Sequence, residues 1–411
     1  MKFHSNATAF LVVLSVLSPL AAAVQPPARI VDAHHHYLDL GGNSFSSWLG
    51  GLFGIFAYLP EHYTADVVEP LAESNITLTG SVHIEVLTDT PFGGVEEAAW
   101  VQSLVDQGDA PELRAIVGSC DLGDADNVEE CLSEMVGASP LVRGIRWILD
   151  YVGPFDGSSA THVNAARKDI DYLRGGADGG VVPDFEKGYA LLGEYDLSFD
   201  GQFAPEQAPA MATLTSRYPN IPVIINHLGK PRLVLGTDSN ATEPDQDILG
   251  EWREGMALLA ALPNTYVKLS MLGYIVPDWI TEERREQIIR DLVLETVEMF
   301  GPKRCMFALN WYLGASISDN DGLGSIGPSP VELTDYMSNW LANYSDEDRE
   351  WIFSKTAETV YKFGEVGDEM ASVEGTQDAM GSDPSSSVVA SVSSGGILAI
   401  LVSSTIVVLL C

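Results

Sequence analysis

The chain is short of basic residues and of cysteine. It has 22 Lys and Arg against 58 Asp and Glu among 411 residues, which gives a formal net charge of −36 at pH 7. Phosphate backbones and anionic lipid surfaces repel such a protein, so we expect no nucleic-acid partner and no docking on lipid through a basic patch. Four cysteines are too few for a disulfide scaffold. The sequence also has no internal repeat.

Enough apolar material is present for a large core, because 46% of the residues are hydrophobic and 19% are charged. Short runs rich in β-branched residues alternate with segments of helical period, which predicts parallel β-α-β units and a single (β/α)8 TIM barrel. A doubly wound open sheet is the alternative, but it needs a glycine-rich phosphate loop where this chain has histidines. The predicted strands are 29–34, 77–85, 113–120, 142–148, 197–202, 223–227, 266–270 and 305–310.

Both ends of the chain are typical of processing signals. Residues 1–23 carry Lys2, an apolar stretch and small residues before a cleavage site, which predicts a signal peptide. Residues 388–411 have no charged side chain and end in an apolar tail, which predicts a GPI-attachment signal; a single membrane-spanning helix is the alternative. The barrel is then expected at 28–366 and a linker at 367–387. We expect the protein in the secretory pathway, anchored to the membrane at the extracellular face of the cell.

In a secreted protein, N-glycosylation sequons and cysteine pairs can be modified. The sequons at Asn75, Asn240 and Asn343 predict N-glycosylation of a secreted chain. Cys120 and Cys131 lie close in the sequence, and we expect them to pair in an oxidising compartment. Two reduced and buried thiols are the alternative.

Histidines gather where the predicted strands end. The carboxyl ends of the strands form the active-site face of a TIM barrel. Four of the eight histidines stand at such ends, namely His34, His36, His83 and His227. Residues two apart on a strand share a face, so His34 and His36 are expected to point inward together. A single core histidine is usually structural, but four at strand ends predict a common pocket.

The motifs at these ends resemble those of the amidohydrolase superfamily. They are Asp32-x-His34-x-His36, His227 in Val-Ile-Ile-Asn-His-Leu-Gly-Lys-Pro, and the eighth-strand segment 304–310. The chain is most similar to the amidohydrolase-related branch of lactonases and dicarboxylate-lactone hydrolases. The resemblance covers residues 30–364 and implies the barrel fold and a lactonase-like hydrolase, but it does not identify the substrate. We expect hydrolysis of a small, carboxylated lactone.

A divalent metal is one way in which the three converging histidines can act. His34, His36 and His227 can bind one zinc or manganese ion as neutral imidazoles, and a metal-bound water would be the nucleophile. The same imidazoles can instead hydrogen-bond the substrate carbonyl without a metal. The expected catalytic set is these three histidines with Asn310.

Cationic and polar strand residues predict a small anionic substrate. Arg146 offers a planar fork that suits a carboxylate. Lys268, Gln202 and His83 are expected as further substrate contacts. As the alternative, the two cations form internal ion pairs with barrel carboxylates, either Asp32 or Asp200.

Two positions depart from the superfamily pattern. Arg146 stands where the binuclear members supply a bridging lysine, so a two-metal centre is not expected. Asn310 stands where an aspartate normally deprotonates the attacking water, and an amide can orient a water but cannot accept its proton. The general base is therefore expected among His34, His36, His227 and Glu85. Two alternatives remain, a metal-dependent non-oxidative decarboxylase and a catalytically inactive cell-surface barrel.

Overall fold

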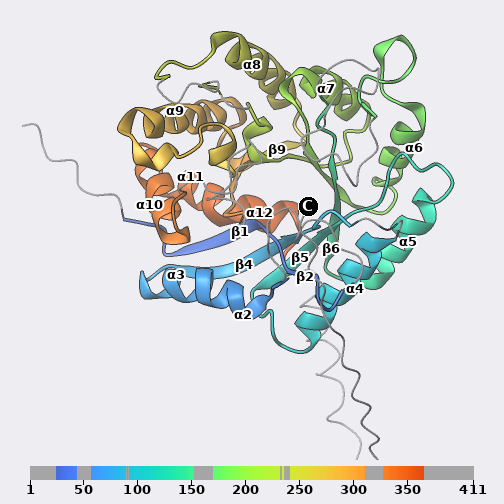
Figure 1. The fold of residues 1–411 in the computed structure, drawn as a ribbon, viewed down its shortest axis with the longest axis horizontal. Helices are drawn as coiled ribbons and strands as arrows, with labels where there is room; N and C mark the ends of the chain where they lie inside the picture. Colours follow the sequence, from blue (N-terminus) through green and yellow to red (C-terminus); the bar gives the residue numbers. More distant parts are fainter. Residues whose placement is uncertain are drawn as a thin grey trace, which may run out of the picture. The chain divides into compact units, whose positions relative to one another are not determined.

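Eight parallel strands form the centre of the fold (Figure 1). In this computed structural model the described residues are 25–43, 57–88, 90, 92–151, 170–231, 234–235, 241–310 and 327–364. Neighbouring strands pair in parallel and in chain order. They are β1 (Arg29–His35), β4 (Thr77–Ile84), β5 (Leu113–Gly118), β6 (Val142–Ile148), β7 (Ser198–Gln202), β8 (Val223–Ile225), β9 (Thr265–Leu269) and β10 (Cys305–Phe307). The predicted TIM barrel is confirmed.

Helices surround the strands (Figure 1), because each has one apolar face to bury against them. In α9, buried residues recur every three to four positions, as Ile289, Val293 and Val297 illustrate.

Two strands pair outside the barrel, β2 (Leu38–Asp39) and β3 (Ala57–Tyr58). The described α-helices are α2 (Pro60–Tyr63), α3 (Glu69–Glu73), α4 (Gly93–Asp106), α5 (Val128–Ala138), α6 (Pro183–Leu191), α7 (Ala208–Arg217), α8 (Gln246–Ala260), α9 (Glu283–Phe300), α10 (Pro330–Trp340), α11 (Asp346–Glu350) and α12 (Thr356–Val360).

The apolar core has two parts, one between strands and helices and one inside the barrel. The inner part includes residues of α12 and Tyr361, so this segment closes one end of the barrel. Arg29, the first residue of β1, forms an ion pair with Glu358 of α12 at 2.9 Å, which identifies the closed end as the amino-terminal one. The other buried residues of the inner part are Val31, Ala33, Val82, Ile84, Ala115, Val117, Ile224, Met306 and Ala308, of which all but Ala308 lie in strands.

The barrel closes between β1 and the segment that follows β10. Strand pairing runs from β1 round to β10, and no ladder joins these two strands in the described part of the chain. The seam is held by single hydrogen bonds instead. The backbone N–H of Asn310 donates to the carbonyl oxygen of His34 at 2.8 Å, and the N–H of Leu309 donates to Asp32 Oδ1 at 2.8 Å.

Cys120 and Cys131 form a disulfide that ties the end of β5 to α5, with their Cα atoms 6.0 Å apart. This separation lies in the usual range for a disulfide. Cys305 is a buried free thiol in β10. Cys411 lies outside the described residues.

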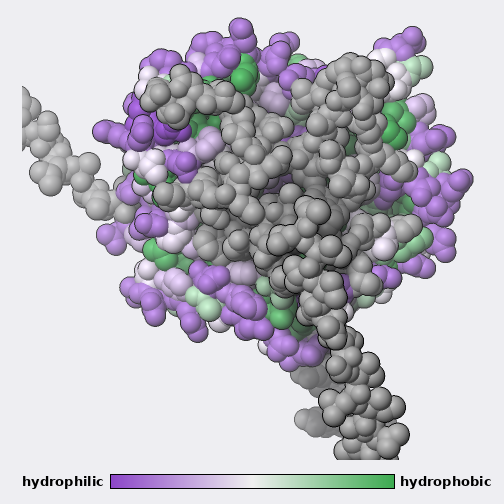
Figure 2. Space-filling model, in the orientation of Figure 1, coloured by the Kyte–Doolittle hydropathy of each residue, from purple (hydrophilic) through white to green (hydrophobic). Residues whose placement is uncertain are grey.

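Hydrophilic residues dominate the described surface seen in Figure 2, and hydrophobic residues occupy small separate areas there. Among the described residues, the large hydrophobic side chains that are exposed are Val136, Ile170 and Leu258. Scattered exposure of this kind is ordinary for a folded domain.

Candidate active site

Three histidines meet at the carboxyl end of the barrel. His34 and His36 lie at the end of β1, where a register irregularity falls between Asp32 and His35. The Nε2 atoms of His34 and His36 are 3.3 Å apart. The ring of His227, which follows β8, has its centroid 5.0 Å from that of His34. All three side chains are buried, so the structure brings together three of the four histidines that were expected to share a pocket.

Hydrogen bonds assign the protons on two of these rings. His36 Nδ1 lies 2.8 Å from the carbonyl oxygen of Ile84, so Nδ1 carries the proton and Nε2 is an acceptor. Lys268 Nζ lies 3.5 Å from His34 Nδ1. An ammonium group can only donate, so His34 accepts at Nδ1 and carries its proton at Nε2. The facing Nε2 atoms are therefore one donor, on His34, and one acceptor, on His36.

A left-handed turn positions His227. Residues 227–230 all have positive φ, and a non-glycine residue in that region costs roughly 1–2 kcal/mol. Strain of this size persists where surrounding contacts hold it, often at functional sites. Here His227 Nδ1 lies 2.9 Å from Ser270 Oγ, and Lys230 Nζ donates to Asp150 Oδ2 at 2.8 Å.

Lys268 is part of a buried ion pair beneath the histidines. Its Nζ donates to Asp200 Oδ1 at 2.6 Å, and the hydroxyl of Tyr361 donates to the same carboxylate at 3.0 Å. Burial lowers the pKa of Lys268, and the charge of Asp200 opposes that shift. The structure thus places Lys268 in the internal ion pair that was the alternative to a substrate contact.

Arg146 is likewise engaged by protein acceptors. Its Nη1 donates to Glu85 Oε1 at 3.1 Å and its Nη2 to Gln202 Oε1 at 2.9 Å. Its Nε donates to Asn226 Oδ1 at 3.2 Å. These bonds use three of the five N–H donors of the guanidinium. Gln202 in turn donates to Asp150 at 2.7 Å, so the two predicted substrate contacts belong to one hydrogen-bonded network.

His83 does not join the cluster, which corrects its expected role as a substrate contact. Ile84 packs inside the barrel, so the preceding side chain faces the helices instead. His83 Nε2 lies 2.9 Å from Glu97 Oε1 in α4, and its Nδ1 accepts from the N–H of Tyr37 at 3.2 Å. Burial lowers the pKa of His83 to about 3. A neutral ring that donates to Glu97 satisfies both nitrogens.

Asn310 lies at the seam of the barrel beside His34, to which its backbone is bonded. Its φ is +51°, an uncommon conformation for a residue other than glycine. Its side chain is buried, and Oδ1 has no hydrogen-bond partner among the described residues. A buried acceptor without a partner usually marks a place for a water or a ligand group.

The three clustered histidines are neutral at pH 7. Burial lowers the pKa of His34, His36 and His227, and nearby cations lower it further. For His36 the pKa falls to about 3, with Arg146 the largest contributor after burial. Neutral imidazole can accept a proton or bind a metal.

The donor set does not fit a three-ligand metal centre. A histidine that binds metal through Nε2 normally donates its Nδ1–H to an acceptor. His36 meets this condition, but His34 presents Nδ1 to the ammonium of Lys268. No group of three or more His, Cys, Asp or Glu side chains is arranged to hold an ion in the part of the chain that the structure describes.

Several residues of this end of the barrel were not singled out from the sequence. Asp32 accepts hydrogen bonds from Tyr63 and from backbone groups beside the site, while Lys230 and Asp150 form a second buried ion pair. Asp32 opens the histidine motif and was a possible ion-pair partner for the barrel cations, but nothing in the sequence indicated its bonds to backbone groups. Nothing in the sequence pairs Lys230 with Asp150, which are far apart in the chain.

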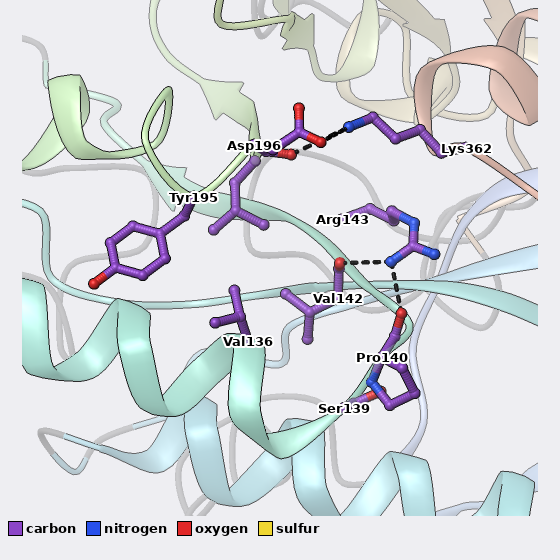
Figure 3. Close-up of a pocket in the computed structure, with 9 residues that line it drawn as sticks. Val136, Ser139, Pro140, Val142, Arg143, Tyr195, Asp196 and Lys362 are labelled. Carbon is purple, nitrogen blue, oxygen red and sulfur yellow. Dashed lines mark hydrogen bonds and ion pairs between the residues drawn. The ribbon is translucent and has the colours of Figure 1, made fainter. Parts of the chain in front are cut away.

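A cavity of about 330 Å³ lies near the starts of β6 and β7, away from the histidines (Figure 3). Lys362 forms an ion pair with Asp196, and Arg143 Nη1 donates to two backbone carbonyl oxygens. None of the predicted site residues lines it. The lining residues are Val136, Ser139, Pro140, Val142, Arg143, Tyr195, Asp196, Leu197 and Lys362.

Comparison with known proteins identifies relatives that match the barrel part of this chain. The amidohydrolase family model matches residues 31–363. L-fucono-1,5-lactonase from Burkholderia multivorans is 24% identical over 341 residues, which cover 82% of this chain and 97% of that protein. The structure of a B. multivorans amidohydrolase with bound zinc is similar, with a TM-score of 0.57, 22% identity, and coverage of 81% of this chain and 99% of that one. A Pseudomonas putida protein assigned as a 2-pyrone-4,6-dicarboxylic acid hydrolase has a TM-score of 0.52, 16% identity, and coverage of 82% and 98%.

The expected location at the extracellular face of the cell membrane is wrong. The L-fucono-1,5-lactonase that matches 82% of this chain is a bacterial enzyme. In the part of the chain that the structure describes, no helix is long and apolar enough to cross a membrane. The prediction rested on short apolar stretches in 1–23 and 388–411, and both lie outside the described residues. Glycosylation at the sequons of Asn75, Asn240 and Asn343 stays a prediction from the sequence.

The family match and the site agree on the same part of the chain. The matched residues 31–363 begin in β1 and end after α12, so they include the other seven barrel strands, most of β1 and the whole histidine cluster. The two structural likenesses show the same fold. The chain belongs to the amidohydrolase family and is a hydrolase.

Proposed function

We propose that this hydrolase opens the ring of a small lactone by adding water to the ester carbonyl. The observation that carries the proposal is the pair of facing Nε2 atoms, a donor on His34 and an acceptor on His36, 3.3 Å apart. Ester hydrolysis needs one group to take a proton from water and another to stabilise the oxyanion. The name of the L-fucono-1,5-lactonase relative supports the same type of bond.

In the proposed reaction, water attacks the carbonyl carbon while His36 Nε2 takes its proton. The Nε2–H of His34 donates to the carbonyl oxygen as negative charge develops there. When the tetrahedral intermediate collapses, the bond from carbon to the ring oxygen breaks. Burial disfavours the charged form of His36, so protonated His36 returns the proton to that oxygen. The product is an open-chain hydroxy acid.

Two other predicted residues have defined parts in the proposal. Asn310 orients the attacking water through its buried amide. His227, whose ring centroid lies 5.0 Å from that of His34, is the third histidine of the site. Arg146 is the predicted contact for a substrate carboxylate, although three of its five N–H donors already bond Glu85, Gln202 and Asn226. The test therefore compares a neutral lactone with a carboxylated one.

The test measures acid release by purified protein at constant pH. Substrates are a sugar 1,5-lactone and a 2-pyrone dicarboxylate, offered before chelation, after chelation, and after zinc or manganese is added. We expect turnover of at least one lactone, and a fall of orders of magnitude in kcat in the folded His227→Ala variant. If no lactone is opened, or if His34, His36 and His227 can each be replaced without changing turnover, the proposal is wrong. Release of CO2 instead of acid would identify a decarboxylase.

A further inference from the structure

The seam of the barrel depends on one buried carboxylate. The edge strands β1 and β10 share no ladder in the described part of the chain, so ordinary strand pairing does not fix their spacing. Asp32 Oδ1 accepts from the N–H of Leu309 at 2.8 Å, across the seam. The same oxygen accepts from the N–H of His34, on its own side, at 3.1 Å. One atom therefore connects the two sides.

The carboxylate is itself held in place. Its other oxygen, Oδ2, accepts from the hydroxyl of Tyr63 at 2.8 Å. Asp32, Tyr63 and Leu309 are all fully buried, so water does not compete for these bonds. Tyr63 ends α2, which ties the carboxylate to the helical layer outside the barrel.

The two sides of the seam carry site residues. His34 lies on one side, and Asn310, next to Leu309, lies on the other. A further bond joins them directly, from the N–H of Asn310 to the carbonyl oxygen of His34 at 2.8 Å. The hydrogen bonds of Asp32 thus hold the backbone at His34 and at Leu309, the residue before Asn310.

We propose that Asp32 is a positioning residue that sets the distance between His34 and Asn310 across the seam. It acts through backbone N–H groups and does not touch the substrate. When the carboxylate is removed, the N–H groups of Leu309 and His34 lose their acceptor, and the seam widens. The kinetic part of this inference rests on the proposed lactone hydrolysis, but the structural part does not.

The experiment compares Asp32→Ala with Asp32→Asn. Asparagine keeps Oδ1 as the acceptor of both N–H groups and can bond Tyr63 through its amide. We expect amide hydrogen exchange at Leu309 and His34 to be at least about 10-fold faster in Asp32→Ala and near the wild-type rate in Asp32→Asn. On a lactone that the wild type opens, kcat should fall about 100-fold in Asp32→Ala with little change in KM, and asparagine should restore most of it.

The matched control is Asp245→Ala. Asp245 also accepts two backbone N–H groups, from Asp247 and Ile248 at the start of α8, but it lies outside the site. Exchange should accelerate at those two amides while kcat stays unchanged.

Three results would overturn the inference. They are unchanged exchange at Leu309 and His34 in a folded Asp32→Ala variant, an unchanged kcat despite faster exchange, and an Asp32→Asn variant as impaired as the alanine one. If Asp32→Ala does not fold, Tyr63→Phe replaces it. Loss of the bond to Oδ2 lets the carboxylate turn and weakens both bonds to Oδ1, so unchanged exchange at Leu309 and His34 would then refute the proposal. If the wild type opens no lactone, the proposed function is refuted. The positioning role of Asp32 is still tested, because hydrogen exchange measures it directly.

Discussion

Arg146 and Glu85 form an ion pair inside the barrel, with Nη1 and Oε1 3.1 Å apart and both side chains almost inaccessible to water. Removing one partner leaves the other charge buried without its counterion, which typically costs about 3–5 kcal/mol. We therefore expect Arg146→Ala to lower the free energy of unfolding by that amount, measured by urea denaturation.

The matched control for Arg146 is Arg253→Ala. Arg253 pairs with Glu295 through two bonds, but both side chains are partly exposed. Exposed pairs contribute about 0–1 kcal/mol. Equal losses in the two variants would show that the Arg146 network does not stabilise the fold.

Acid should destabilise the protein through its buried neutral histidines. The pKa of His83 falls from 6.5 to about 3 on folding. Between these pH values the unfolded chain binds a proton that the folded protein does not, so the free energy of unfolding decreases as pH falls, by up to about 1.4 kcal/mol per pH unit for such a group. Urea denaturation between pH 8 and pH 4 should show this decrease.

His83→Gln provides the specific test of the pH effect. Glutamine can still donate to Glu97 but does not titrate, so the pH slope should be shallower. His62→Gln, which removes an exposed histidine, serves as the control and should leave the slope as in the wild type. A wild-type slope in His83→Gln would contradict the prediction.

The fold was predictable because the same pattern, a short β-branched run followed by a helical segment, recurs along the chain. Every predicted strand overlaps an observed one, and the clearest differences are at the ends of β8 and β10. There the predicted runs continue to His227 and Asn310, but both residues have positive φ. A strand cannot continue through that conformation, and side-chain type alone does not reveal it.

The site was predictable only in part. The alternation of side chains along a strand shows which residues share a face, but it does not show which residues of other strands they contact. It placed His34 and His36 together, yet it could not show that Ile84 packs inside the barrel and turns His83 outward. The sequence also left open whether Lys268 faces the substrate. That depends on Asp200, which is distant in sequence and 2.6 Å away in space.

The disulfide should stabilise the fold measurably. Linking Cys120 and Cys131 closes a loop of eleven positions, and the loss of chain entropy in the unfolded state is worth about 3 kcal/mol. Reduction, or the double change Cys120→Ser with Cys131→Ser, should lower the free energy of unfolding by this amount. Labelling of thiols in the denatured, unreduced protein provides the check, and labelling of both cysteines would refute the bond.

Asn310→Asp tests whether water activation limits the proposed reaction. Oδ1 of Asn310 is buried without a partner among the described residues, so a carboxylate there can reach a water beside His34. Burial should raise the pKa of the new carboxyl. Only the ionised carboxylate can take a proton from water, so kcat of this variant should rise with pH as the carboxyl ionises. We expect kcat to be preserved or raised on the high-pH side of that ionisation, and Asn310→Ala to lower kcat without unfolding the protein. The pH profiles of kcat for the three proteins provide the measurement. If the aspartate variant is folded but inactive at every pH while the alanine variant keeps full activity, Asn310 does not orient the water.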